Sequence, residues 1–435
     1  MAAEWRKGCS IDKFAARLET SKIPQEQDGV KFEGFQFRDC SAVLYNLIDC
    51  KGIPEGEKRR IVTQAIFNAG AKGGITPDTL LVEIRELEIL FWKQAVSRFV
   101  LCTSLSIDRF SDLRLRKLDR IHIKFLHRLP KSFEKGVERI REISEYSLSA
   151  QPPDDYIQVL ISVDARSPVD AAAQAFEAID LLRGIWNFGI NRRHINRNSY
   201  GDRKPVNEIV MGPLHSLHLP DGKLATEMWW YDPEYQKPVK PLSLRDDRDK
   251  LRLDKIEQSG RTILKKHNYR NVIESGIKEY CRALDHRNWS NAFLKLWSVL
   301  ELLTHTEKEN YGVTIRRASF VWTDAEYHRE VLNHLRHLRN SFVHENKSTD
   351  DVETYMYQLK LYVEALINFH LGRGLSFSSI SESAEFMDLP IEQKVLRKKM
   401  ALFDDALKFR KFQQCPTRAT TGLKTSRSGL WRCNE

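Results

Sequence analysis

The sequence predicts an α+β N-terminal region followed by an all-helical bundle. Short runs rich in β-branched and aromatic residues recur between about residues 99 and 231, with helical patterns among them. A segment at 234–244 carries Pro238 and Pro241 and is typical of a linker. Beyond it, apolar residues recur every three or four positions to about residue 371, which is the period of a helix.

The front region combines helices and strands. Helices are expected at 55–71 and 78–92, and Thr76 followed by a proline is a plausible start for the second. A third should begin at Ser167, which precedes a proline and has Asp170 three positions later, and should reach about residue 188. Strands are expected at 99–105, 121–126, 156–163, 206–211, 214–219 and 226–231. The first fifty residues show no clear pattern.

The region after the linker is predicted to be helical throughout. The expected helices are 246–265, 272–284, 291–304, 325–344 and 351–371, with a further helix within 380–412. Apolar stripes of this kind pack against one another in a bundle. We therefore divide the chain into an α+β domain at 1–240, a helical bundle at 245–375 and a helical extension with a basic tail at 376–435.

Composition excludes several classes of protein. No run of 18 or more apolar residues occurs, so we expect no transmembrane helix and no membrane partner. The first twenty residues lack the apolar core of a secretory signal. The seven cysteines are scattered and form no C-x-x-C pair, which argues against a zinc site and a disulfide framework. A cytoplasmic protein without metal or cofactor is expected.

The net charge of +10 is concentrated at the C-terminal end. From residue 391 to residue 435 there are eleven Lys or Arg and four Asp or Glu, a net of +7. Two interpretations remain open. The segment is either a solvated tail, the usual fate of a charge run, or an arm that binds nucleic-acid phosphates without sequence preference.

The predicted helix at 325–344 has two unlike faces near its end. An apolar stripe typical of a helix packed on a core is formed by Leu335, Leu338 and Phe342. The other face is polar and spans an arc of roughly 100°; its residues are His337, Asn340, Ser341 and His344. Because histidine exchanges protons near neutral pH, this polar face is a candidate functional surface.

The end of this helix resembles a known ribonuclease signature. Arg339 and His344 frame the sequence Arg-Asn-Ser-Phe-Val-His, which is similar to the R-x4–6-H motif of the HEPN superfamily. The predicted helix at 291–304 is rich in aromatic and aliphatic residues and contains Glu301, and it resembles the second helix of Apea-like HEPN domains. The resemblance covers roughly residues 250–375.

The resemblance implies a metal-independent endoribonuclease that leaves a 2′,3′-cyclic phosphate and a 5′-OH. His344 is the candidate general base or acid, because it can exchange a proton at neutral pH. Arg339 can fork two hydrogen bonds to phosphate oxygens and stabilise the transition state, and Asn340 can orient His344 or a phosphate oxygen. The residues expected to support them are Glu301, Ser341 and His337.

Three further arginines are expected to contact RNA: Arg336, Arg192 and Arg193. Arg192 and Arg193 open a basic run that follows two aromatic residues, a combination that suits single-stranded nucleic acid. A solvated loop is the alternative interpretation of that run. Arg339 also has an alternative, which is a simple ion pair with Glu345 or Glu301.

The spacing within the motif sets a geometric condition. Five residues on an ideal helix correspond to about 140° of rotation, so Arg339 and His344 do not share a face. Arg339 must reach round the helix, or the helix must end between them, or two subunits must combine their motifs. The resemblance implies the last arrangement, and we expect a homodimer formed through the HEPN domain.

Three functions are compatible with these patterns. The first is an endoribonuclease of prokaryotic phage defence or of toxin-like RNA degradation. The second is a non-catalytic HEPN module for dimerisation or RNA binding. In the third, which is compatible with the first, residues 50–235 sense a phage-derived or nucleotide trigger and restrain the nuclease.

Overall fold

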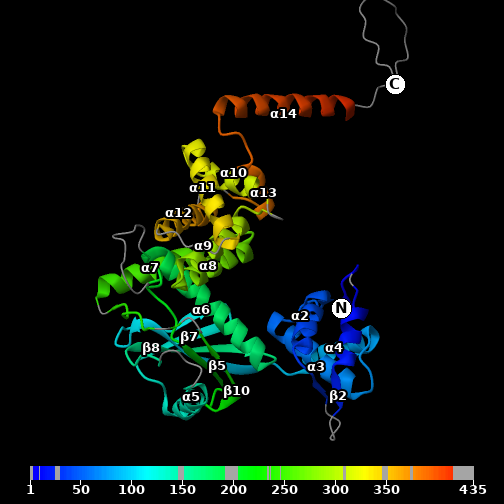
Figure 1. Cartoon of the computed structure of the whole chain (residues 1–435). Coiled ribbons are helices and arrows are strands. Elements are labelled where there is room, and N and C mark those ends of the chain that lie inside the picture. Colours follow the sequence, from blue (N-terminus) through cyan, green and yellow to red (C-terminus); the bar gives the residue numbers. More distant parts are fainter. Residues whose placement is uncertain are drawn as a thin grey trace, which may run out of the picture.

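The computed structural model describes residues 3–8, 10–24, 30–145, 151–191, 204–232, 235, 237–244, 246–306, 310–344, 351–372 and 376–414, excluding the side chains of 343, 344 and 412–414. A sheet-containing N-terminal region is followed by a mostly helical remainder, as the sequence predicts (Figure 1). Separate apolar cores divide the N-terminal region in two. The chain therefore forms three consecutive units and a projecting C-terminal helix.

The first unit is a small helical body. It is built from the first fifty residues, for which the sequence showed no clear pattern, and from the helices expected at 55–71 and 78–92. Its helices are α1 (Asp12–Thr20), α2 (Gln36–Leu47), α3 (Glu55–Ala71) and α4 (Pro77–Lys93). Two small antiparallel pairs flank them: β1 (Glu4–Trp5) with β4 (Ile48–Asp49), and β2 (Lys22–Pro24) with β3 (Val30–Phe32). Leu18, Leu44, Ile61 and Phe91 are buried in its core.

The second unit is a six-stranded antiparallel sheet in the order β10-β9-β5-β8-β7-β6. Its strands are β5 (Ser97–Asp108), β6 (Arg116–Leu118), β7 (Ile121–Leu126), β8 (Tyr156–Ala165), β9 (Leu214–His218) and β10 (Leu224–Tyr231). The central strand β5 is buried at nine consecutive positions, so both faces of the sheet are covered. Phe133 of α5 (Lys131–Ser144) packs on one face and Trp186 of α6 (Pro168–Ile190) on the other.

The expected strand at 206–211 is wrong. Apart from an isolated bridge between Met211 and Leu105, this segment forms no ladder. Its backbone is bound mainly by side chains and a helix end: Ile209 N–H donates to Asn187 Oδ1 at 3.0 Å, and Val206 N–H donates to the Leu284 carbonyl at 3.0 Å. The apolar residues that suggested a strand are buried because the segment is wedged between α6 and the end of α8 (Arg270–Asp285).

Helix α6 joins the sheet to the helical bundle. One side of the helix, from Ala171 to Trp186, packs into the sheet core, whereas Leu181 and Ile185 on another side belong to the bundle core. A Cβ at Gly184 would lie 2.9 Å from the Ile277 carbonyl oxygen of α8, so only glycine allows this close crossing. Ion pairs also join the two helices where they cross: Arg183 of α6 lies 2.9 Å from Asp285 at the end of α8. The two units are therefore held together by a tight and highly charged contact.

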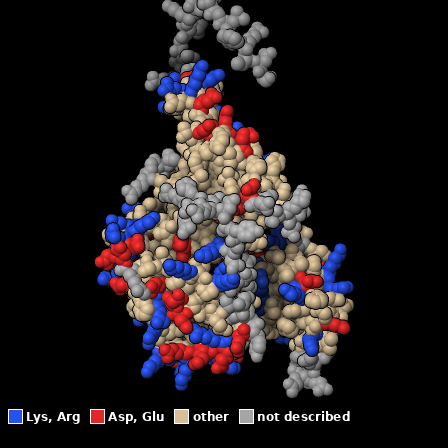
Figure 2. All heavy atoms as spheres, turned by 60° about the vertical axis from the view of Figure 1, so that its left-hand side comes forward, with Lys and Arg blue, Asp and Glu red and all other residues tan. Residues whose placement is uncertain are grey.

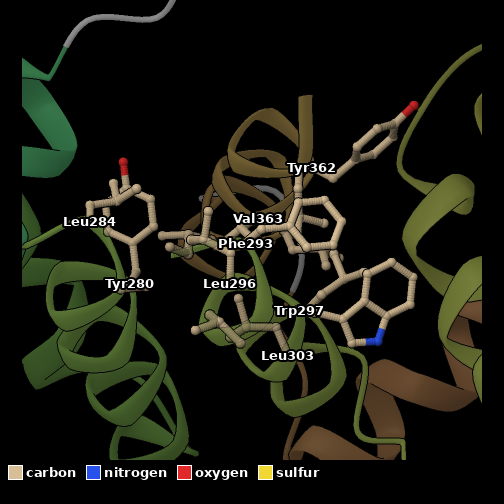
Figure 3. Close-up of a cluster of buried hydrophobic side chains, with 14 of the residues drawn as sticks. Tyr280, Leu284, Phe293, Leu296, Trp297, Leu303, Tyr362 and Val363 are labelled. Carbon is tan, nitrogen blue, oxygen red and sulfur yellow. The ribbon is translucent and has the colours of Figure 1, made fainter. Parts of the chain in front are cut away.

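The third unit is the helical bundle. It consists of α7 (Asp247–Lys265), α8, α9 (Trp289–Leu303), α10 (Tyr311–Phe320), α11 (Ala325–His344), α12 (Val352–Leu371) and α13 (Ile380–Met387). Figure 3 shows Phe293, Leu296 and Trp297 of α9 projecting among side chains of α8 and α12. The apolar stripes predicted from the sequence therefore face one core, which fixes the ends of α9, α10 and α11 relative to one another.

The last described element, α14 (Gln393–Gln414), projects away from the bundle (Figure 1). Its large apolar side chains Met400, Leu402, Phe403, Leu407 and Phe409 are 59–68% exposed. Lys and Arg side chains gather on this projecting helix (Figure 2). Residues 415–435 of the basic tail lie outside the described residues. Among the described helices, none combines the length and apolar character needed to cross a membrane.

Candidate active site

Helix α11 carries the proposed motif at its C-terminal end and is anchored by its apolar face. Leu332, Leu335 and Phe342 are buried, and Leu338 packs against the same core. The Phe342 ring meets the Phe293 ring of α9 edge-on at 5.3 Å. The last turns of α11 are thus held against the bundle, and His337 of the predicted polar face is exposed.

The first half of α11 is pinned by a histidine that the sequence analysis did not single out. His328 stacks on Trp322 at 4.2 Å, and its Nδ1 shares a 2.7 Å hydrogen bond with the Tyr362 hydroxyl of α12. Burial lowers the pKa of His328, so it is neutral at physiological pH. A neutral, stacked and hydrogen-bonded imidazole has a structural role here.

Arg339 lies against an aromatic ring. Its guanidinium carbon is 5.1 Å from the centroid of Tyr311, the first residue of α10, and its Nη1 donates a long 3.4 Å hydrogen bond to Asn340 Oδ1. A guanidinium over an aromatic face is stabilised by the ring quadrupole while its N–H groups stay available at the edge. Arg339 is therefore positioned without consuming most of its donors.

Glu301 reaches the same region through aromatic residues. Trp297 Nε1 donates to Glu301 Oε1 at 2.9 Å, and the Trp297 ring meets the Tyr311 ring edge-on at 6.3 Å. Arg339, Tyr311, Trp297 and Glu301 thus form a continuous series of contacts that joins α11, α10 and α9. The structure brings together three of the predicted residues, namely Arg339, Asn340 and Glu301.

The other predicted residues are placed less tightly. His337 is exposed, whereas Ser341 and Arg336 are half-buried on α11. His344 is the last residue of α11, and its side chain lies outside the described set. Arg192 and Arg193 fall outside the described residues, so their expected contact with RNA stays a prediction.

The backbone decides one of the alternatives for the motif. Helix α11 runs without interruption from Ala325 to His344. Arg339 and His344 are therefore about 140° apart around one helix, as ideal geometry gives for five residues. The alternative in which the helix ends between them is wrong, so Arg339 must reach round or a second motif must complete the site.

Two members of the site were not identified from the sequence. Tyr311 begins the short helix α10, which was not predicted. Trp297 was assigned no role in the site: it was interpreted as part of an apolar stripe and of the helix that resembles the second HEPN helix. The signal for Tyr311 is Asn310 before it, whose side chain accepts a hydrogen bond from Val313 N–H as a helix cap. Within the described part of the chain, no group of three or more potential metal-ligating side chains is found.

Comparison with protein-family models, curated proteins and solved structures finds no match to this chain. The likeness to HEPN domains therefore depends on the motif, on its place at the end of a bundle helix and on the helix that contains Glu301.

Proposed function

We propose that this chain is a metal-independent endoribonuclease of the HEPN type, with Arg339, Asn340 and His344 in its catalytic centre. The observation that carries the proposal is the position of Arg339. It lies at the C-terminal end of a well-anchored helix, over the Tyr311 ring, with one long hydrogen bond in the described structure. Such an arginine can bind a phosphate without first breaking an ion pair.

The proposed reaction is a transesterification within RNA. The ribose 2′-oxygen bonds to the adjacent phosphorus and the bond from phosphorus to the 5′-oxygen breaks, which leaves a 2′,3′-cyclic phosphate and a 5′-OH. His344 takes the proton of the 2′-OH, or gives a proton to the departing 5′-oxygen. Arg339 stabilises the negative charge that develops on the phosphate oxygens.

A two-fold homodimer would complete this centre. Because Arg339 and His344 are about 140° apart on an unbroken helix, two copies of α11 that face each other can present the arginine of one copy and the histidine of the other. In this arrangement RNA binds along the joint polar surface, with Arg336 as a further phosphate contact and with His337, Ser341 and Glu301 in support.

The test is an end-chemistry assay. We expect purified full-length protein to cleave mixed cellular RNA in the presence of EDTA and to leave 2′,3′-cyclic phosphate ends. His344→Ala should reduce the rate by about 10²–10⁴-fold, the usual contribution of a general acid or base. His334→Ala is the matched control, because His334 is an exposed histidine on the same helix whose ring contacts Tyr355.

Three outcomes would contradict the proposal. Cleavage that EDTA abolishes would indicate a metal-dependent reaction. A His344→Ala variant that cuts as fast as the parent would remove the histidine from the mechanism. RNA binding without cleavage, with an affinity that falls as salt rises, would support the non-catalytic HEPN module instead.

We further propose that the enzyme degrades RNA in the prokaryotic cytoplasm during phage defence or toxin-like growth arrest. Induced expression of the parent should then arrest growth, whereas expression of His344→Ala should not. If the parent and His344→Ala arrest growth equally at equal protein levels, the growth effect does not depend on the catalytic motif.

A further inference from the structure

A large cleft lies where the sheet unit meets the first two bundle helices. It has a volume of about 980 Å³. Its walls come from the β6–β7 hairpin, from α6 and from α7 and α8. Helix α6 packs against α7, α8 and β7. The cleft shares no lining residue with the motif at the end of α11, so it is separate from the proposed catalytic centre.

The floor of the cleft is apolar, and part of it consists of small side chains. Small and aliphatic side chains of α6 form it, with further apolar residues from the hairpin and α7: Ala173, Ala178, Leu181, Ile185, Leu118, Ile121 and Leu264. Alanines on a helix leave a shallow surface on which a flat ring can lie. Gln258 and Thr262 of α7 stand beside this floor and can form hydrogen bonds with the edge of a ring or with hydroxyl groups.

The rim of the cleft carries six carboxylates and six cations, but they are engaged to different extents. Five carboxylates are in ion pairs: Glu257 and Asp254 with Arg116, Glu257 also with Arg261, Asp119 and Glu274 with Arg270, and Glu177 with Lys278. Asp170 accepts a hydrogen bond from Gln174. Four of the six cations, namely Arg116, Arg261, Arg270 and Lys278, are therefore already held in ion pairs.

The other two cations of the rim lie outside these ion pairs. Within the part of the chain that the structure describes, Arg120 and Lys265 are exposed and make no ion pair. Arg120 comes from the β6–β7 turn, and Lys265 is the last residue of α7. The ion pair between Asp119 and Arg270 joins the β6–β7 turn to the start of α8, so both cations lie toward this end of the cleft.

We propose that this cleft binds a nucleoside phosphate. The base lies on the apolar floor from α6, Gln258 and Thr262 bond to the base edge or ribose, and Arg120 and Lys265 bind the phosphates. The shallow apolar surface suits a planar ring, and the two cations that are not held in an ion pair of the described structure can donate hydrogen bonds to an anion. Because both units line the cleft, the bound ligand contacts the sheet unit and the bundle at once.

Binding is tested directly on the full-length protein, independently of ribonuclease activity. Titration calorimetry with ATP should show saturable binding, whereas adenosine and inorganic phosphate should each bind at least about tenfold more weakly, because each keeps only part of the contacts. Arg120→Ala and Lys265→Ala should each weaken ATP binding by about tenfold or more, as expected for loss of a charged hydrogen bond.

Two matched variants make the test specific. Lys266→Ala removes the neighbouring charge, which does not line this cleft, and should leave ATP affinity unchanged. Ala173→Trp fills the floor at an exposed helical position and should abolish binding while the melting temperature of the ligand-free protein stays near that of the parent.

Several results would overturn the proposal. These are the absence of saturable ATP or GTP binding up to millimolar concentration, equal loss with Lys266→Ala and Lys265→Ala, or unchanged binding by a folded Ala173→Trp variant. Adenosine binding as tightly as ATP would also overturn the role of the two cations. None of these results bears on RNA cleavage, so failure here is distinguishable from failure of the proposed ribonuclease.

Discussion

Two arginines on long helices of this molecule have opposite surroundings. Arg183 of α6 is buried, with 2% of its side chain exposed, and donates to Asp180 at 2.6 Å, to both oxygens of Asp285 and to the Ile209 carbonyl. Arg339 of α11 is half-buried, lies over the Tyr311 ring and, among the described residues, makes one hydrogen bond of 3.4 Å.

The difference separates structural from functional use of the same side chain. The donors of Arg183 are largely occupied by the protein, so this arginine joins α6 to α8 and has little left for a ligand. Among the described residues Arg339 makes no ion pair, and most of its donors are available to an external phosphate. The comparison predicts that loss of Arg183 affects folding, whereas loss of Arg339 affects activity.

The largest expected effect is on stability, from Arg183→Met. The variant keeps the length of the side chain but leaves Asp180 and Asp285 without their buried partner, although Asp180 retains Arg282 at 2.7 Å. Breaking a buried ion pair from one side typically costs about 3–5 kcal/mol. Urea unfolding of the parent and the variant at pH 7 measures this loss of unfolding free energy.

The matched control is Arg248→Ala, which removes an exposed pair with Asp246 whose arginine side chain is 91% exposed. A surface pair of this kind contributes about 0–1 kcal/mol. If Arg183→Met and Arg248→Ala change the unfolding free energy by similar amounts, the structural role assigned to Arg183 is wrong.

The next effect is on catalysis, from Arg339→Ala. Removing one preorganised donor to a developing oxyanion usually reduces kcat by about 10²–10³-fold. The unfolding free energy should change by only about 1 kcal/mol, because Arg339 contributes a half-buried cation–π contact and one long hydrogen bond. Single-turnover RNA cleavage and urea unfolding of the same preparations measure the two quantities.

Arg339→Lys sharpens this prediction. Lysine keeps the charge and the contact with the Tyr311 ring but cannot form two parallel hydrogen bonds to a phosphate. We expect its cleavage rate to lie between those of the parent and Arg339→Ala. Full cleavage activity in Arg339→Ala would contradict a catalytic role for Arg339. A loss of unfolding free energy as large as that of Arg183→Met would indicate that Arg339, like Arg183, has a structural role.

Long periodic segments of this fold could be predicted from the sequence. The helices at 55–71 and 325–344 have the predicted bounds, and the Ser167 cap was identified, since its Oγ accepts a hydrogen bond from Asp170 N–H at 3.2 Å. The wrong strand at 206–211 shows the limit. Its apolar residues are buried without forming a strand, and its backbone N–H groups donate to the side-chain oxygens of Asn187 and Asn191, contacts that no local pattern reveals.

The candidate site was predictable in part. The motif and its apolar anchor lie on one helix: residue spacing predicted the apolar stripe, and the resemblance to the R-x4–6-H signature suggested the motif. Tyr311 and the nucleotide cleft depend on contacts between distant segments: Tyr311 meets Arg339 only through the bundle, and the cleft combines residues from Pro54 to Lys278. The ion pairs around this cleft join segments that are distant in the sequence. Which cations remain outside such pairs therefore cannot be predicted before the fold is known.

The smallest effect that we predict concerns His215, which lines a small cavity together with Arg183. Burial lowers the pKa of His215 to about 3, and its Nδ1 shares a 2.7 Å hydrogen bond with Thr103 Oγ1. In the unfolded chain histidine protonates near pH 6.5. Because the unfolded state binds the proton first, stability from this group is complete above pH 6.5 and is lost as pH falls toward 3.

Between pH 7 and pH 5 this histidine alone should lower the unfolding free energy by about 2 kcal/mol. His215→Gln removes the titrating group, so its pH-dependent loss over that range should be smaller than that of the parent by this amount. Should the variant fold poorly, the imidazole resonances of His215 in the parent provide the second measurement and should not titrate above pH 5. Titration of His215 near pH 6.5 would mean that the surroundings of Arg183 are open to water, and the contrast with Arg339 would then fail.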